Sequence, residues 1–132
     1  MTINADVTDN SDAFLWRLAG CSGIVRKAAT DVEANAKAAI QTGAKTGKTY
    51  KRGRKGTHQA SAAGEAPATD TGALVNSISA QAEGRFVWVV TVASAYGAIL
   101  ELRRNRPFLL PALDKVKPTF EAALLRHLAA GD

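Results

Sequence analysis

The first hydrophobic pattern along the chain is helical. Over residues 12–42, apolar side chains return every three or four positions, which is the spacing of one buried helix face. The spacing predicts a helix over 12–42, bent or broken near Gly20 and Gly23, because a glycine inside a helix costs about 1 kcal/mol relative to alanine. Residues 1–10 carry no such pattern and are expected to form a frayed tail.

Residues 44–70 show neither a helical nor a strand period, and Tyr50 is their one large side chain. Ordering a backbone costs about 1–2 kcal/mol per residue, and this stretch offers almost no apolar surface to offset that cost. We therefore expect a mobile arm over 44–70 in an isolated subunit. Fully extended, such an arm reaches roughly 80–90 Å, which is enough to lie on a neighbouring molecule.

From residue 71 the pattern becomes that of a hairpin. Leu74 and Ile78 are the first expected core side chains, residues 77–83 alternate between apolar and polar, and 86–94 is rich in β-branched and aromatic residues. Two antiparallel strands joined by a turn over 83–85 follow from this pattern. Both faces of 86–94 are largely apolar, so we expect one face against this chain's helices and the other against a second subunit.

Two further helices are expected. Residues 95–102 suit a short helix, and the apolar stripe over 110–128 predicts a C-terminal helix with a kink or restart at Pro118, which cannot donate a backbone hydrogen bond. The whole chain, 1–132, then forms one α+β domain. It comprises a long N-terminal helix, a mobile basic arm, a small antiparallel sheet around a hairpin, and a C-terminal helix packed on that sheet.

Charge is concentrated in the expected arm. The chain has a net charge of +5, and no acidic residue lies between Glu33 and Glu65. A basic run of this kind suits a phosphate backbone, an acidic protein surface or an anionic membrane, although a solvated loop is the simpler interpretation. The residues that could contact a DNA channel or an acidic partner are Lys45, Lys48, Lys51, Arg52, Arg54 and Lys55.

No residue pattern points to catalysis, a metal or a cofactor. His58 and His127 have no Cys, Asp or Glu at metal-ligand spacing, and the "GAKTGKT" stretch is one residue short of a phosphate-binding loop. The single cysteine, Cys21, excludes an intrachain disulfide and fits a reducing compartment. No apolar run approaches the length of a membrane span. We expect a non-enzymatic protein made in the cytoplasm.

Three segments in a fixed order carry a family resemblance. These are "HQASAAGEAPATDTGALVNSI", "VTVASAYGAILEL" and "RPFLLPAL", within residues 57–128. Together they resemble the tail-completion or head–tail joining family of long-tailed double-stranded DNA bacteriophages. The resemblance implies a virion protein that joins a ring in the neck, between the portal side and the tail tube, without catalysis. The chain departs from the family at 101–104, where "ELRR" replaces a turn that commonly contains glycine.

The resemblance also implies partners and an interface. In a homo-oligomeric ring each subunit can lay its arm on the next, beside a head-closure or adaptor ring, a tail terminator or the tail tube, in host cytoplasm first and then in the virion neck. A tail terminator capping the tube, or a small non-specific DNA-binding protein, remain alternatives. The expected interface residues are Tyr50, Pro67, Thr71, Leu74, Val87, Val89, Arg103, Arg104 and Arg106.

The DNA-binding alternative has a direct test. Binding through the basic run should weaken steeply with salt, because phosphate contacts release counterions. Neutralising Lys51, Arg52, Arg54 and Lys55 together should abolish that salt dependence in a filter-binding or anisotropy titration with duplex DNA. Normal phage assembly by the neutralised variant would reduce the run to a solubilising loop.

Overall fold

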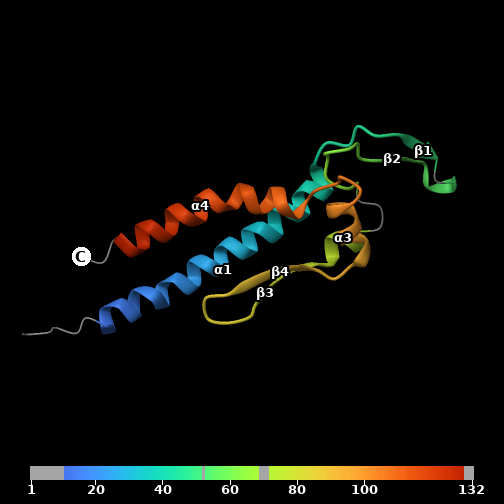
Figure 1. Ribbon diagram of the computed structural model, residues 1–132. Coiled ribbons are helices and arrows are strands. Elements are labelled where there is room, and N and C mark those ends of the chain that lie inside the picture. Colours follow the sequence, from blue (N-terminus) through green and yellow to red (C-terminus); the bar gives the residue numbers. More distant parts are fainter. Residues whose placement is uncertain (1–10, 52, 69–71, 130–132) are drawn as a thin grey trace, which may run out of the picture.

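The computed structural model describes residues 11–51, 53–68 and 72–129, and its architecture is α+β as predicted (Figure 1). Two long helices, α1 and α4, lie side by side, and a β-ribbon packs on α1. The elements are α1 (Ser11–Thr42), β1 (Thr49–Lys51), a 3-10 turn η1 (Gly53–Lys55), β2 (Thr57–Gln59), α2 (Ala73–Asn76), β3 (Ile78–Ala82), β4 (Trp88–Val92), α3 (Ala95–Leu102) and α4 (Leu109–Ala129). The predicted frayed tail, Arg52 and Thr71 lie outside the described residues.

The predicted break in the first helix is wrong. Helix α1 continues through Gly20 and Gly23 to Thr42. Gly20 has a packing role, because a Cβ atom there would lie 2.4 Å from the imidazole ring of His127 on α4. That ring is hydrogen-bonded through Nε2 to the carbonyl of Arg17 at 2.8 Å. Close approach of α4 therefore accounts for the glycine, and tertiary packing overrides its low helix propensity.

The β3–β4 ribbon lies on α1 in the predicted orientation. The pairs Ile78–Val92, Ala80–Val90 and Ala82–Trp88 are directly opposite in the antiparallel register, so these residues share one face. That face includes Val90 and Val92, which pack against the core. The carboxylate of Glu33 on α1 accepts a 2.9 Å hydrogen bond from the Ala80 N–H. A hydrogen bond from the Lys37 ammonium and, to a smaller extent, the bond from Ala80 lower the pKa of Glu33.

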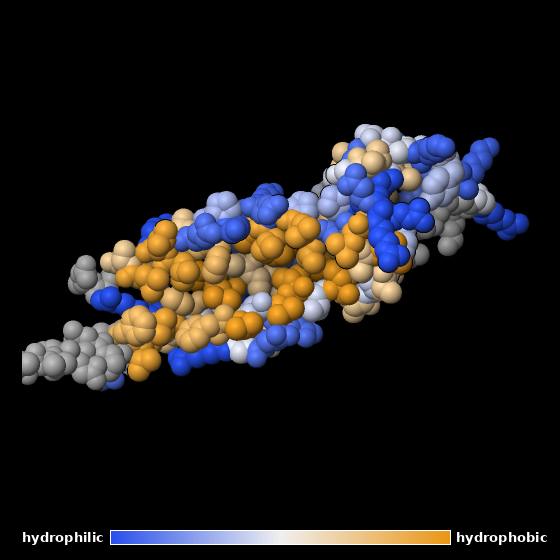
Figure 2. All heavy atoms as spheres, viewed as in Figure 1, coloured by the Kyte–Doolittle hydropathy of each residue, from blue (hydrophilic) through white to orange (hydrophobic). Residues whose placement is uncertain are grey.

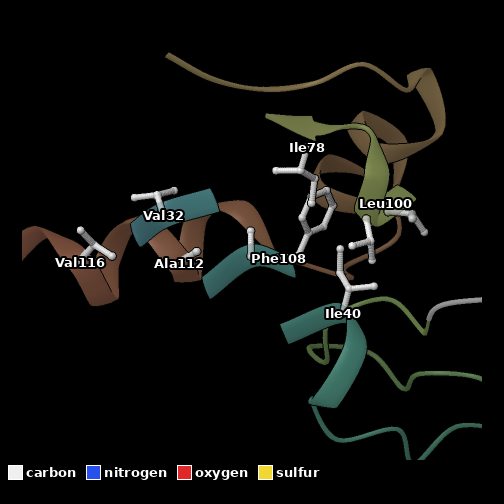
Figure 3. Close-up of a cluster of buried hydrophobic side chains, with 9 residues drawn as sticks. Val32, Ile40, Ile78, Leu100, Phe108, Ala112 and Val116 are labelled. Carbon is white, nitrogen blue, oxygen red and sulfur yellow. The ribbon is translucent and has the colours of Figure 1, made fainter. Parts of the chain in front are cut away.

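The core lies where α1, the ribbon and the chain leading into α4 meet. Phe108, Ile40 and Ile78 are its largest fully buried side chains. Figure 3 shows the ring of Phe108 next to Ile78, with Leu100 and Ile40 close by. Toward the middle of α1 the core narrows to smaller residues such as Ala36 and Val32. Alanine and valine bury little area each, so the stabilisation they supply is small.

Helix α4 begins on a side chain supplied by α3. The carboxylate of Glu101 accepts hydrogen bonds from the N–H groups of Phe108, Leu109 and Leu110 at 2.7, 3.1 and 2.9 Å. These amides belong to Phe108, which directly precedes α4, and to the first two residues of the helix, where no intrahelical acceptor exists. The connection turns through Asn105, whose φ of 50° takes the left-handed conformation that a glycine usually supplies.

Two other predictions need correction. Helix α4 runs without interruption through Pro118, so the alternative of a restart there is wrong. The arm, predicted without any regular element, contains the hairpin β1–β2, in which Tyr50 pairs with His58. Figure 1 shows this hairpin projecting from the end of the molecule opposite the start of α1. The mobility of the arm in a free subunit stays a prediction.

The Glu101 contact predicts a large effect for an acidic residue near the surface. Glu101→Ala should lower the free energy of unfolding by about 1–3 kcal/mol, because three amides of the first turn lose their acceptor. Urea unfolding followed by circular dichroism measures this change. Glu83→Ala, at an exposed turn residue, is the matched control and should change stability by less than about 0.5 kcal/mol. Equal effects of the two substitutions would contradict the capping role.

Candidate partner-binding cavity

Five of the nine predicted interface residues line one cavity. The cavity has a volume of about 690 Å³ and lies between the β1–β2 hairpin, the loop that follows it, α2 and the connection from α3 to α4. The predicted residues among its lining are Tyr50, Pro67, Leu74, Arg104 and Arg106. They come from segments as far apart in sequence as β1 and the α3–α4 connection, and the fold brings them together.

The cavity combines positive charge with aromatic and apolar surface. Arg104 is exposed, and Arg106 is half-buried with its Nη1 donating to the carbonyls of Arg104 and Asn105 at 3.0 and 3.3 Å. The ring of Tyr50 lies 5.4 Å from that of His58, in a tilted arrangement. Guanidinium groups beside apolar side chains suit a carboxylate or phosphate that has apolar neighbours.

Sequence reasoning missed several lining residues, of which Tyr96 is the most exposed. Tyr96 lies on α3 and is 62% exposed. It belongs to the segment "VTVASAYGAILEL", which carries part of the resemblance, but it was not among the expected interface residues. His58, Ser94 and Leu100 also line the cavity. Their contribution depends on where α3 sits relative to the hairpin, and no sequence spacing encodes that position.

The base of the hairpin is held by charged side chains bonded to backbone. The ammonium of Lys45 donates to the carbonyls of Ala39, near the end of α1, and Ala66, both at 3.1 Å. Burial lowers the pKa of Lys45. This lysine was a candidate DNA contact, and its ammonium instead closes the carboxyl end of α1, where a cation is favoured. Gly47 is needed beside it, since a Cβ there would lie 2.5 Å from the carbonyl oxygen of Ser61.

Glu65 completes this base. Its carboxylate accepts hydrogen bonds from the Thr46 hydroxyl and from the N–H groups of Thr46 and Ala62, both 2.8 Å. The Thr46 hydroxyl, followed by the two amides, lowers the pKa of Glu65 to about 2. The carboxylate thereby joins the two strands of chain that lead into and out of the hairpin.

The remaining predicted residues lie apart from the cavity. Lys48, Lys51 and Arg54 are exposed on or beside the hairpin. Nothing is described of Arg52 or of the Lys55 side chain, so the structure places only part of the basic run. Arg103 is exposed after α3.

Val87, 53% exposed, and Val89 lie on the side of the β-ribbon opposite α1. Their neighbours Gln81 and Thr91 are polar and exposed. This face is therefore less apolar than the sequence suggested.

A larger apolar surface lies between α1, β4 and α4. A groove of about 520 Å³ is lined mainly by aliphatic side chains, including Val25, Val90, Leu110 and Leu113, with Phe120 toward its far end. Figure 2 shows the corresponding apolar band along the molecule, between polar margins. Leu110 and Leu113 belong to the apolar stripe that predicted this helix, and they are 55% and 47% exposed. The pattern marked the correct helix face, but no element of the described chain covers it.

Comparisons of the chain with protein-family models, with curated proteins and with solved structures found no match. Within the described ranges, no three His, Cys, Asp or Glu side chains cluster in a way that could hold a metal ion. Among the helices described, none combines the length and apolar character needed to cross a lipid bilayer. The cavity and the groove are therefore the features on which a functional proposal can be based.

The Glu65 contacts predict a local effect that depends on pH. Because folding lowers the pKa of Glu65 from 4.5 to about 2, its contribution is fully present above pH 4.5 and is lost as pH falls toward 2. At neutral pH, Glu65→Gln should speed hydrogen exchange at the Thr46 and Ala62 amides, while core amides of α1 stay protected. The control is Glu83→Gln. Unchanged exchange at both amides in the Glu65 variant would refute this role.

Proposed function

We propose that this protein is a structural subunit of a bacteriophage neck, forming a homo-oligomeric ring that joins the DNA-filled head to the tail. The resemblance of residues 57–128 to the head–tail joining family suggests this role. The observation that carries it structurally is the open apolar groove between α1, β4 and α4. A second copy of the chain is the occupant we propose for this groove.

Exposed apolar side chains outside the groove also support a protein partner. Trp16 is 79% exposed near the start of α1, and Leu125 is 69% exposed near the end of α4. Monomeric proteins rarely expose large contiguous apolar patches, and such patches usually mark sites of association. Burial of Leu113, Leu110 and their neighbours by another copy would supply area that the alanine-rich core does not provide.

The β1–β2 hairpin is the second element of the proposed ring. It projects from one end of the molecule (Figure 1) and carries the exposed cations Lys51 and Arg54. In the neck it would contact an acidic surface of an adjacent ring or the DNA that passes through. The same hairpin favours non-specific DNA binding as the second candidate function. A tail-terminator role uses the same ring and differs only in the neighbouring protein.

Assembly can be tested at the groove. Leu113→Asp should shift the purified protein from a ring toward monomer in sedimentation velocity, because it places a charge on the proposed apolar contact. Since Leu113 is 47% exposed, the subunit itself should stay folded. Thr119→Asp, at an exposed α4 position outside the groove lining, is the matched control and should leave the ring intact. A wild-type protein that remains monomeric at high concentration, with or without its phage partners, would argue against the proposal.

A further inference from the structure

We propose that the cavity lined by Arg104, Arg106 and Tyr96 binds the acidic N-terminal segment, residues 1–10, of a neighbouring copy of the chain. This inference rests on the proposed ring, and it names the contact that closes it. It concerns a site separate from the apolar groove, and it names an acidic peptide segment as the group that binds there.

The segment and the cavity are complementary in charge and in apolar character. Residues 1–10 contain Asp6 and Asp9 and no lysine or arginine, and they also contain Ile3 and Val7. The cavity offers two arginines together with the apolar side chains of Pro67, Leu74 and Leu100. Carboxylates pair well with guanidinium groups, and Ile3 and Val7 of the segment would contact the apolar side chains that line the cavity.

The nearby carboxylates within the described chain are already engaged. Glu101 is bonded to the first amides of α4, and Glu65 is bonded to Thr46 and Ala62. Neither is therefore placed to neutralise Arg104. Arg104 and Arg106 line the open cavity, and no carboxylate of the described residues forms an ion pair with either, which favours an acidic group from outside the subunit.

Chain length makes this contact intermolecular. Helix α1 has 32 residues and is about 48 Å long, at about 1.5 Å per residue. The cavity lies near its carboxyl end, where Leu100 packs with Ile40. Asp6 precedes Ser11 by five residues, which span at most about 18 Å when extended. The segment therefore falls short of the cavity of its own subunit and can reach only that of another.

A contact between one end of a subunit and the other end of the next is heterologous. Such contacts generate closed rings when the rotation between subunits closes, and open filaments when it does not. The N-terminal segment and the cavity are at opposite ends of α1, so their pairing repeats from subunit to subunit in one direction. This geometry is the one that the proposed ring requires.

The test uses the full-length protein and a fluorescent peptide of residues 1–12. Anisotropy titration of the wild-type protein at low concentration should show salt-sensitive binding. Double reversal, Arg104→Glu with Arg106→Glu, should weaken binding at least about tenfold, and a peptide carrying Asp6→Lys and Asp9→Lys should restore it with the reversed protein. Lys115→Glu makes the same change from positive to negative charge at an exposed position on α4. This control should keep the affinity for the natural peptide within about twofold of the wild-type value.

Any one of the following outcomes would overturn the inference. One is equal binding of the natural peptide to the wild-type and doubly reversed proteins, and another is failure of the swapped pair to restore binding. The third concerns Asp70, which lies in sequence between the lining residues Ala68 and Gly72. If Asp70→Asn raised the affinity for the peptide more than about tenfold, the arginines of the wild-type protein would be paired within the subunit. A wild-type protein that binds a DNA oligonucleotide but does not bind the peptide would also reject the inference. Rings that persist in the Arg104→Glu, Arg106→Glu variant would reject this contact but leave the ring proposal standing. Peptide binding by a protein that is strictly monomeric would support the contact and reject the ring proposal.

Discussion

The packing of α4 and the β-ribbon onto one narrow face of α1 is the constraint on which the rest of the structure depends. That face carries small residues such as Ala29 and Ala36, both buried, and its large side chains gather only around Ile40 and Phe108. Small residues allow close approach, as Gly20 does for His127, but they bury little area. The consequence is a slender molecule with an apolar groove that no element of the described chain covers.

Charged side chains secure the segments that this core does not hold. Glu33 bonds to β3, Glu101 begins α4, and Glu65 with Lys45 fixes the base of the hairpin. Each bonds to backbone groups at a helix end, a strand or a loop, and hydrogen bonds to a charged group are stronger than those between neutral groups. Because these carboxylates are used internally, the arginines after α3 face the cavity without them. In the contact that we propose, the same interactions that hold the fold thus leave these arginines available to an acidic partner.

The sequence was sufficient to predict the elements whose apolar residues follow a clear helical or strand period. The α3 bounds, 95–102, coincide with the prediction, and β3 and β4 lie within the predicted 77–83 and 86–94. It was insufficient for the β1–β2 hairpin, because each strand has only three residues and depends on the Glu65 bonds across 19 positions. The break expected at Gly20 failed for a similar reason, since the cause of that glycine lies on α4.

The candidate site shows the same division. Tyr50, Pro67 and Leu74 were chosen from the motif and the arm, and they do meet Arg104 in one cavity. Val89 was expected at the same interface but lies elsewhere, on β4, and Leu113 of the predicted apolar stripe is 47% exposed. Periodicity identifies an apolar face, but it does not distinguish burial within a chain from burial between chains.

Native mass spectrometry of the purified full-length chain, over a range of concentrations, tests the central claim most directly. The account predicts one discrete oligomer larger than a dimer, without an open-ended ladder of sizes, because heterologous contacts that close leave no free end. A protein that stays monomeric at every concentration, with its apolar groove still exposed, would contradict it.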